Sequence, residues 1–113
     1  PIIKAPIAAM KRGMIDEVFS VGVKSIDGLL TCGKGRKLGI FAGSGVGKST
    51  LMGMIVRGAD APIKIVALIG ERGREVPEFI EKNLGGDLTN TVIIVATSDD
   101  SPLMRKYGAF AAM

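Results

Sequence analysis

The fold of this chain is decided by one short stretch, which reads Ala42-Gly43-Ser44-Gly45-Val46-Gly47-Lys48-Ser49-Thr50. An apolar run at residues 37–41 precedes it, and residues 49–57 have the apolar spacing of a helix. Glycines let a backbone curl so that successive N–H groups point toward one anion. A helix that follows adds its unpaired N–H groups and the positive end of its dipole. The pattern therefore predicts a phosphate-binding loop between a strand and a helix.

The loop has the residue types that bind a triphosphate together with Mg²⁺. The Lys48 ammonium can reach the β- and γ-phosphate oxygens, and the Ser49 hydroxyl can ligate Mg²⁺. The strict pattern has glycine at the first position, where this chain has Ala42. An incidental glycine-rich turn is the alternative, and the register of strand, loop and helix disfavours it. The predicted nucleotide contacts are Gly43, Ser44, Gly45, Val46, Gly47, Lys48, Ser49 and Thr50.

Composition narrows the class of protein. The chain has 113 residues, enough for one small domain, and an apolar content of 47% is typical of a globular protein. No apolar run is as long as a membrane span, and we expect no secretory signal. The single cysteine, Cys32, excludes an internal disulfide, favours a reducing compartment and is predicted to be a packing residue. The chain has no histidine, and its charge of +4 is weak evidence for nucleic-acid binding.

Strands and helices are predicted to alternate along the chain. Strands are expected at residues 38–41, 63–69 and 91–96, and the second should be covered on both faces. Helices are expected at residues 22–30, 49–57 and 77–84, and from Ser101-Pro102 onward, where the serine reads as a cap. This order predicts an α/β fold with a parallel sheet and flanking helices. Residues 1–20 are expected to be an irregular lead-in segment and residues 21–113 a phosphate-binding domain of this fold.

Three polar loops are predicted to meet at the carboxyl edge of this sheet, where ligands of such sheets bind. They are residues 42–49, 70–75 and 97–100. Hydrolysis of a γ-phosphate needs a group that orients the attacking water, and Glu71 is our candidate. Arg72 or Arg74 can stabilise charge or hold the Glu71 loop by ion pairs. The alternative is a solvated loop whose charges pair with each other.

Asp99 and Asp100 follow the third predicted strand at a distance of three and four residues. A magnesium-binding aspartate of a phosphate-loop ATPase usually stands at the strand end itself. The spacing before Ser101 instead predicts a turn or a helix cap. We therefore expect that this chain does not contain the magnesium aspartate.

Longer segments extend the pattern beyond the loop. Residues 22–35, 39–49, 68–76 and 96–103 resemble the flagellar protein-export ATPases, which are related to type III secretion ATPases and to the catalytic subunit of rotary ATP synthases. The resemblance implies a RecA-like core that binds ATP and Mg²⁺ through Lys48 and Ser49. It places Glu71 in the family's Gly-Glu-Arg motif as the residue that activates water, with Arg72 beside it.

The family has further parts that these residues do not match: a β-barrel, a strand with the magnesium aspartate, an arginine finger and a helical domain. The resemblance therefore implies a central fragment, which alone should bind ATP weakly and hydrolyse little of it. It also implies a cytoplasmic hexameric ring that works with the flagellar export apparatus, its substrates and chaperones. The resemblance further implies that the ring associates peripherally with the membrane through the export gate. It implies no binding of nucleic acid.

Two other functions stay open at this point. A RecA-like nucleic-acid motor, such as a helicase or strand-exchange protein, predicts turnover that nucleic acid stimulates. The low aromatic content of 4% offers little surface for base stacking. A non-hydrolysing regulatory module predicts nucleotide-dependent self-association without release of phosphate.

Overall fold

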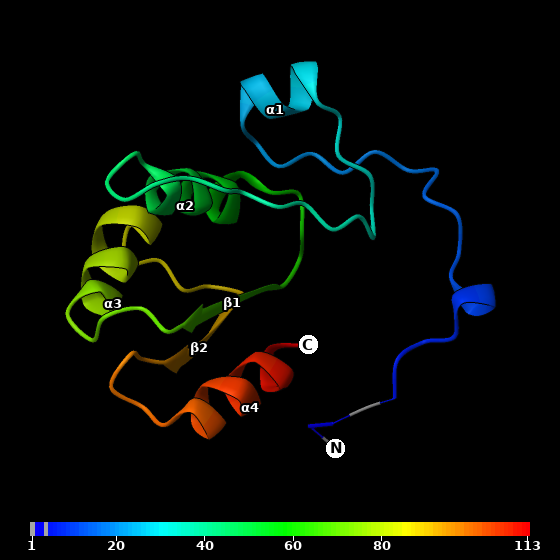
Figure 1. Cartoon of the computed structure of the whole chain (residues 1–113). Helices are drawn as coiled ribbons and strands as arrows, with labels where there is room; N and C mark the ends of the chain where they lie inside the picture. Colours follow the sequence, from blue (N-terminus) through cyan, green and yellow to red (C-terminus); the bar gives the residue numbers. More distant parts are fainter. Residues whose placement is uncertain (1, 4) are drawn as a thin grey trace. The chain divides into compact units, whose positions relative to one another are not determined.

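The computed structural model describes residues 2–3 and 5–113 (Figure 1). The chain divides into two compact units, and each is described by itself. The loop unit is Ile7–Ala61, and the sheet unit is Pro1–Pro6 together with Pro62–Met113. No helix among the described residues is long and apolar enough to cross a bilayer.

The loop unit is built around two α-helices. After a single 3₁₀ turn, η1 (Ala9–Lys11), come α1 (Lys24–Leu29) and α2 (Lys48–Gly58). An isolated antiparallel bridge joins Val18 to Gly33. The other described residues before Val21 have no helix or strand.

A small apolar core holds the loop unit together. Its four members are each less than a tenth exposed: Val21, Val23, Ile26 and Cys32. The partly buried side chains of Phe19, Leu51 and Ile55 pack against this core. This confirms the interpretation of Cys32 as a packing residue. The helix predicted at residues 22–30 forms over Lys24–Leu29, although its last apolar residue, Leu29, is 83% exposed.

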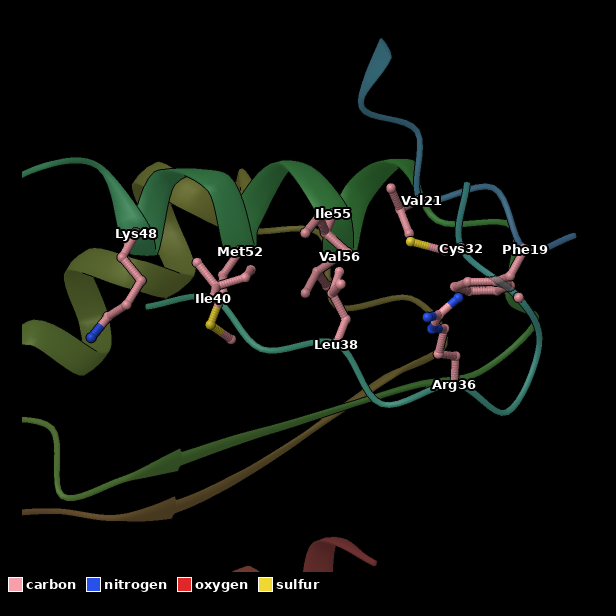
Figure 2. Close-up of a pocket in the computed structure, with 11 residues that line it drawn as sticks. Phe19, Val21, Cys32, Arg36, Leu38, Ile40, Lys48, Met52, Ile55 and Val56 are labelled. Atoms are coloured by element: carbon pink, nitrogen blue, oxygen red, sulfur yellow. The ribbon is translucent and has the colours of Figure 1, made fainter. Parts of the chain in front are cut away.

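The strand predicted at residues 38–41 is wrong. This segment is an extended connection without strand structure, and none of the backbone hydrogen bonds found among the described residues involves it. A strand requires a neighbouring backbone to pair with. The side chains of Leu38 and Ile40 instead lie along α2, facing Met52 and Val56 (Figure 2). Apolar contact with the helix thus replaces the predicted strand pairing.

The described residues of the sheet unit form two parallel strands, whereas a sheet of three strands was predicted. β1 (Lys64–Ile69) pairs with β2 (Thr91–Ala96) in register, from Lys64 opposite Thr91 to Ile69 opposite Ala96. Between them the chain forms a short helix α3 (Glu75–Glu78) and a π-helical turn η2 (Phe79–Asn83), and it ends in α4 (Pro102–Ala112). The mixed α/β class with a parallel sheet and flanking helices is confirmed.

The prediction that β1 is covered on both faces is wrong, because Ile65 and Ala67 on one face are exposed and Ile69 on that face is half-buried. Val66 and Leu68 point to one face and are 3% and 5% exposed, while Ile65 on the other face is 58% exposed. Helix α4 lies beside the strands in Figure 1, and its Gly108 comes close to Ile69 and Ala96. The helix therefore covers the carboxyl end of that face and leaves its amino end open.

The helix boundaries after β1 follow the sequence signals. Pro77 lies in the first turn of α3, where a missing N–H costs nothing. Gly85 and Gly86 have φ values of +70° and +71°, which favour glycine, and the Gly86 N–H donates to the Ile80 carbonyl at 3.1 Å. The predicted stop at these glycines is confirmed.

Candidate functional site

The predicted phosphate loop is a tight bend that leads into α2. Residues 44–45 form a turn, residues 46–47 a bend, and Lys48 is the first residue of the helix. Gly45 and Gly47 have φ values of +74° and +96°, in the left-handed region that glycine adopts without strain. The stretch is therefore curled rather than extended, which is the geometry that a concave group of N–H donors requires.

The glycines of this loop face open space. A Cβ atom built at Gly43, Gly45 or Gly47 would meet no other atom of the described residues within 4 Å. At Gly45 and Gly47 the positive φ explains the choice of glycine, but Gly43 has no such φ. Neither packing nor backbone conformation therefore accounts for Gly43, whereas a ligand lying close to the backbone would.

The first turn of α2 supplies the remaining donors of the loop. Lys48, Ser49 and Thr50 are exposed, and Gly47 caps the helix without a side-chain hydrogen bond. The first N–H groups of a helix have no partner inside it. Backbone N–H groups, an ammonium and two hydroxyls thus lie together and exposed, and this set of donors can bind an anion with its metal ion.

A cavity of about 390 Å³ lies along the apolar side of α2. Figure 2 shows Lys48 at one end of its lining, and Arg36 with Phe19 at the other. Between these ends the lining is mainly apolar, with Met52, Ile55 and Val56 from α2. The cavity is a gap between the helix and the connection that precedes the loop, and its lining offers few polar groups for a phosphate.

The second predicted loop follows β1 directly in the sheet unit. Gly70 has a φ of +80°, and its N–H donates to the Ala96 carbonyl at 2.7 Å. The Ser98 N–H donates to the Glu71 carbonyl at 2.8 Å. The predicted meeting at the carboxyl edge of the sheet is therefore found for residues 70–75 and 97–100, where Glu71 is half-buried, while residues 42–49 belong to the loop unit.

The charged groups of this edge pair locally. An Arg72 guanidinium nitrogen lies 3.5 Å from a Glu75 carboxylate oxygen, and both side chains are substantially exposed. Such an exposed pair contributes little to stability, but it ties the loop to the start of α3. Asp100 accepts hydrogen bonds from the Thr97 N–H at 2.7 Å and from its hydroxyl at 3.2 Å. The interpretation of Asp100 as a turn residue is confirmed.

The predicted site residues are thus distributed over two units. Gly43 to Thr50 lie in the loop unit, whereas Glu71 and Arg72 lie in the sheet unit. The phosphate loop leads into α2 in the first unit, and Glu71 and Arg72 follow β1 in the second.

Asp27 belongs to a hydrogen-bond cluster that its sequence position did not reveal. Its carboxylate accepts from the Ser20 hydroxyl at 2.8 Å, the Val21 N–H at 2.9 Å and the Gly22 N–H at 3.0 Å. These bonds, chiefly that from Val21 and then that from Ser20, hold the pKa of Asp27 below its ordinary value. The sequence offered one sign of this cluster: Asp27 is an acidic residue in the first turn of α1, and Gly22 precedes that helix.

Comparison with known proteins identifies the family. Residues 22–113 match the sequence model of the ATP synthase alpha/beta family, nucleotide-binding domain. The chain is 82% identical over all 113 residues to the flagellum-specific ATP synthase of Helicobacter pylori strain J99, and it spans 26% of that protein's length. It is 57% identical over 110 residues to the flagellum-specific ATP synthase of Bacillus subtilis, of which it spans 25%.

Solved structures agree with this assignment. A prototypical ATPase from the type III secretion system of pathogenic bacteria is 53% identical and superposes with a TM-score of 0.89 over 99% of this chain and 32% of that one. The assembled ATPase EscN of enteropathogenic E. coli, in complex with its central stalk EscO, is 53% identical with a TM-score of 0.90, over 98% of this chain and 27% of that one. The chain therefore belongs to the ATP synthase alpha/beta family and corresponds to part of its nucleotide-binding domain.

Proposed function

We propose that this chain is the ATP-binding part of a longer ATPase that drives protein export in the flagellar branch of the family. The identity of 82% to a flagellum-specific ATP synthase supports the branch. The chain spans about a quarter of that relative's length, so the complete reaction belongs to the longer protein, and residues 21–113 form part of its ATPase domain.

One observation carries the proposal: the curled loop before α2 has glycines whose Cβ positions are open. Gly43, Gly45 and Gly47 let the triphosphate approach the backbone, and the N–H groups of residues 43–50 donate to its oxygens. The Lys48 ammonium neutralises the β- and γ-phosphates, and the Ser49 hydroxyl holds Mg²⁺. Bound Mg²⁺ supplies charge neutralisation at the transferred phosphoryl group.

Hydrolysis requires groups from the sheet unit as well. The Glu71 carboxylate orients and polarises the attacking water, and Arg72 stabilises charge beside it. The hydrogen bond from Ser98 fixes the main chain at Glu71, and the ion pair with Glu75 restrains Arg72. This half of the site is therefore held by its own sheet edge.

The intact protein acts as a ring of six subunits in the cytoplasm. Its partners are the flagellar export apparatus, the export chaperones and the export substrates. The export gate attaches the ring peripherally to the membrane. The supporting relatives are the assembled EscN ATPase and its complex with a central stalk.

The proposal is tested by calorimetric titration of ATP with Mg²⁺ into the intact ATPase that contains this segment, as the parent and as its Lys48→Ala and Lys106→Ala variants. Removal of an ionic hydrogen-bond partner costs about 1.5–3 kcal/mol, which is roughly a tenfold to hundredfold loss of affinity. Lys106 is an exposed lysine of α4, so its replacement should leave the affinity unchanged.

Each outcome of this titration decides one point. Equal affinity of the parent and Lys48→Ala would remove the lysine from the site. Absence of ATP binding by the intact ATPase that contains this segment would overturn the proposed function itself.

A further inference from the structure

The far end of α2 rests against a backbone turn. Gly58, the last residue of the helix, lies against Gly22, which has a φ of +74°. A Cβ built at Gly22 would overlap the Gly58 carbonyl group. A Cβ built at Gly58 would lie 3.0 Å from the Gly22 Cα and 3.3 Å from the carbonyl oxygens of Val21 and Gly22. Position 22 therefore has no room for a side chain, and a side chain at position 58 would require its neighbours to shift by a few tenths of an ångström.

The turn on which the helix rests is rigidly held. The Asp27 carboxylate binds the Ser20 hydroxyl and the N–H groups of Val21 and Gly22, at 2.8 to 3.0 Å. Three hydrogen bonds to one carboxylate fix both the direction and the conformation of the turn. Gly22 consequently cannot move aside without breaking bonds to a charged group.

A second contact fastens the chain just beyond α2 to the same turn. The Asp60 N–H donates to the Ser20 carbonyl at 3.0 Å, and the Ala59 N–H donates back to Ile55 at 2.8 Å. Val21 and Val23, on either side of Gly22, are 4% and 6% exposed in the core against which Leu51 and Ile55 of α2 pack. The helix end is therefore held by backbone contact, by a hydrogen bond and by apolar packing.

We propose that Ser20, Gly22, Asp27 and Gly58 form a clamp that positions α2 and, through it, the nucleotide loop. This inference rests on the proposed function, because it gives the clamp a role in ATP binding. An α-helix is a stiff rod, and α2 runs without interruption from Lys48 at the loop to Gly58 at the clamp. A displacement at the clamp is consequently transmitted to Lys48 and to the N–H groups of the loop. The four residues are positioning residues, since none of them belongs to the loop itself.

The clamp makes a prediction that helix propensity alone does not make. Alanine is a better helix former than glycine, so Gly58→Ala in a merely structural helix end should leave the stability unchanged or raise it. If the clamp positions the loop, the new methyl group pushes α2 off the turn and weakens ATP binding. We expect about a tenfold loss of affinity, because small misplacements of binding groups are costly.

The experiment compares the parent with Gly58→Ala and with a matched control, Gly28→Ala. Gly28 also lies in a helix of the loop unit, and a Cβ there would meet nothing within 4 Å. ATP affinity is measured by titration and stability by urea unfolding, both in the intact ATPase that contains this segment. The expected result is weaker ATP binding by Gly58→Ala than by the parent and the Gly28→Ala control, under conditions where urea unfolding shows that each variant is folded.

A milder pair of variants guards against a failure of Gly58→Ala to fold. Ser20→Ala removes one bond to Asp27, whereas Ser20→Thr keeps the hydroxyl. ATP affinity should fall in the first variant and be retained in the second. Equal affinity in the parent, Gly58→Ala and Ser20→Ala would overturn the clamp while the proposed function stands. A parent that does not bind ATP would overturn the proposed function instead.

Discussion

At the residue scale, Glu71 shows how a catalytic candidate can be fixed through its main chain. Its carbonyl accepts from Ser98 on the neighbouring loop, and Gly70 before it adopts a φ of +80° at the end of β1. The backbone is thus set by the sheet edge, and Glu71 as a whole is half-buried beside the turn that follows. Such a carboxylate can be replaced by an amide without disturbing these main-chain bonds.

Glu71→Gln is therefore expected to separate binding from hydrolysis. The amide keeps the shape of the side chain but cannot accept a proton or polarise water as a carboxylate does. Turnover of ATP by the intact ATPase should fall roughly a hundredfold or more, with ATP affinity within about twofold of the parent. Single-turnover phosphate release and ATP titration measure the two quantities.

The matched control for this variant is Glu81→Gln, an exposed carboxylate of η2 in the same unit. Its turnover should equal that of the parent. A Glu71→Gln enzyme with parental turnover would assign the activation of water to another group.

The residue scale also shows what the sequence could reveal. Lys48 at the start of α2, Cys32 in the core and Ser101 at a helix cap were predictable because neighbours in the sequence determine each of them. Asp27 was not, since its partners at residues 20–22 become a site only after the chain has folded back. The contact of Gly22 with Gly58 spans a still longer separation, and no local pattern encodes it.

At the element scale, helix α4 has a cap that is confirmed by the structure. Ser101 precedes Pro102, the first helical residue, and its side-chain oxygen accepts from the Met104 N–H at 3.3 Å. The capping oxygen satisfies one of the N–H groups that the first turn leaves unpaired. Helix α4 covers the carboxyl end of both strands, so its stability bears on the edge that holds Glu71.

Ser101→Ala should destabilise the chain by about 1 kcal/mol, the usual cost of losing a serine cap. Urea unfolding followed by circular dichroism measures the change. Ser101→Asp retains an acceptor at the cap and should keep the parental stability, because a carboxylate also favours the positive end of the helix dipole. Equal loss in both variants would show that the hydroxyl acts through something other than capping.

The elements differ in how far the sequence determines them. Helices α2 and α4 and strands β1 and β2 were predictable, because their apolar periodicity and their glycine or serine boundaries are local. The apolar run at residues 38–41 has the same local character, yet it forms no strand. Strand formation depends on a partner backbone, and in this segment Leu38 and Ile40 lie against the apolar side of α2 instead.

At the scale of the whole molecule, much apolar surface is exposed in both units. Phe41 is 96% exposed in the loop unit, while Ile65 and Val92 on the open half of the sheet face are 58% and 51% exposed. Soluble proteins rarely leave contiguous apolar surface of this kind uncovered. This surface is in accord with a chain that spans about a quarter of the length of the relatives it matches.

The dependence of the chain's folding stability on pH is set in part by carboxyl groups with lowered pKa values. Hydrogen bonds lower the pKa of three carboxyl groups. The chief donor is the Val21 N–H for Asp27, the Lys82 ammonium for Glu78 and Thr89 for Asp87. Each of these groups binds its proton more weakly in the folded chain than in the unfolded chain. Their contributions to stability are therefore present at neutral pH and lost as the pH falls through the ordinary carboxyl range toward the lowered pKa values.

Asp27→Asn should change this acid dependence in a defined direction. The amide cannot accept all three hydrogen bonds, so the variant should be less stable than the parent at neutral pH. It should then lose less stability on acidification, because the carboxylate that must be protonated is gone. Urea unfolding over a series of acid pH values measures both effects.

Asp16→Asn, which removes an exposed carboxylate outside the clamp, should keep the parental dependence of stability on pH. Parallel curves for the parent and Asp27→Asn would show that the turn does not depend on the charge of Asp27, and the clamp would then rest on the contact between Gly22 and Gly58 alone.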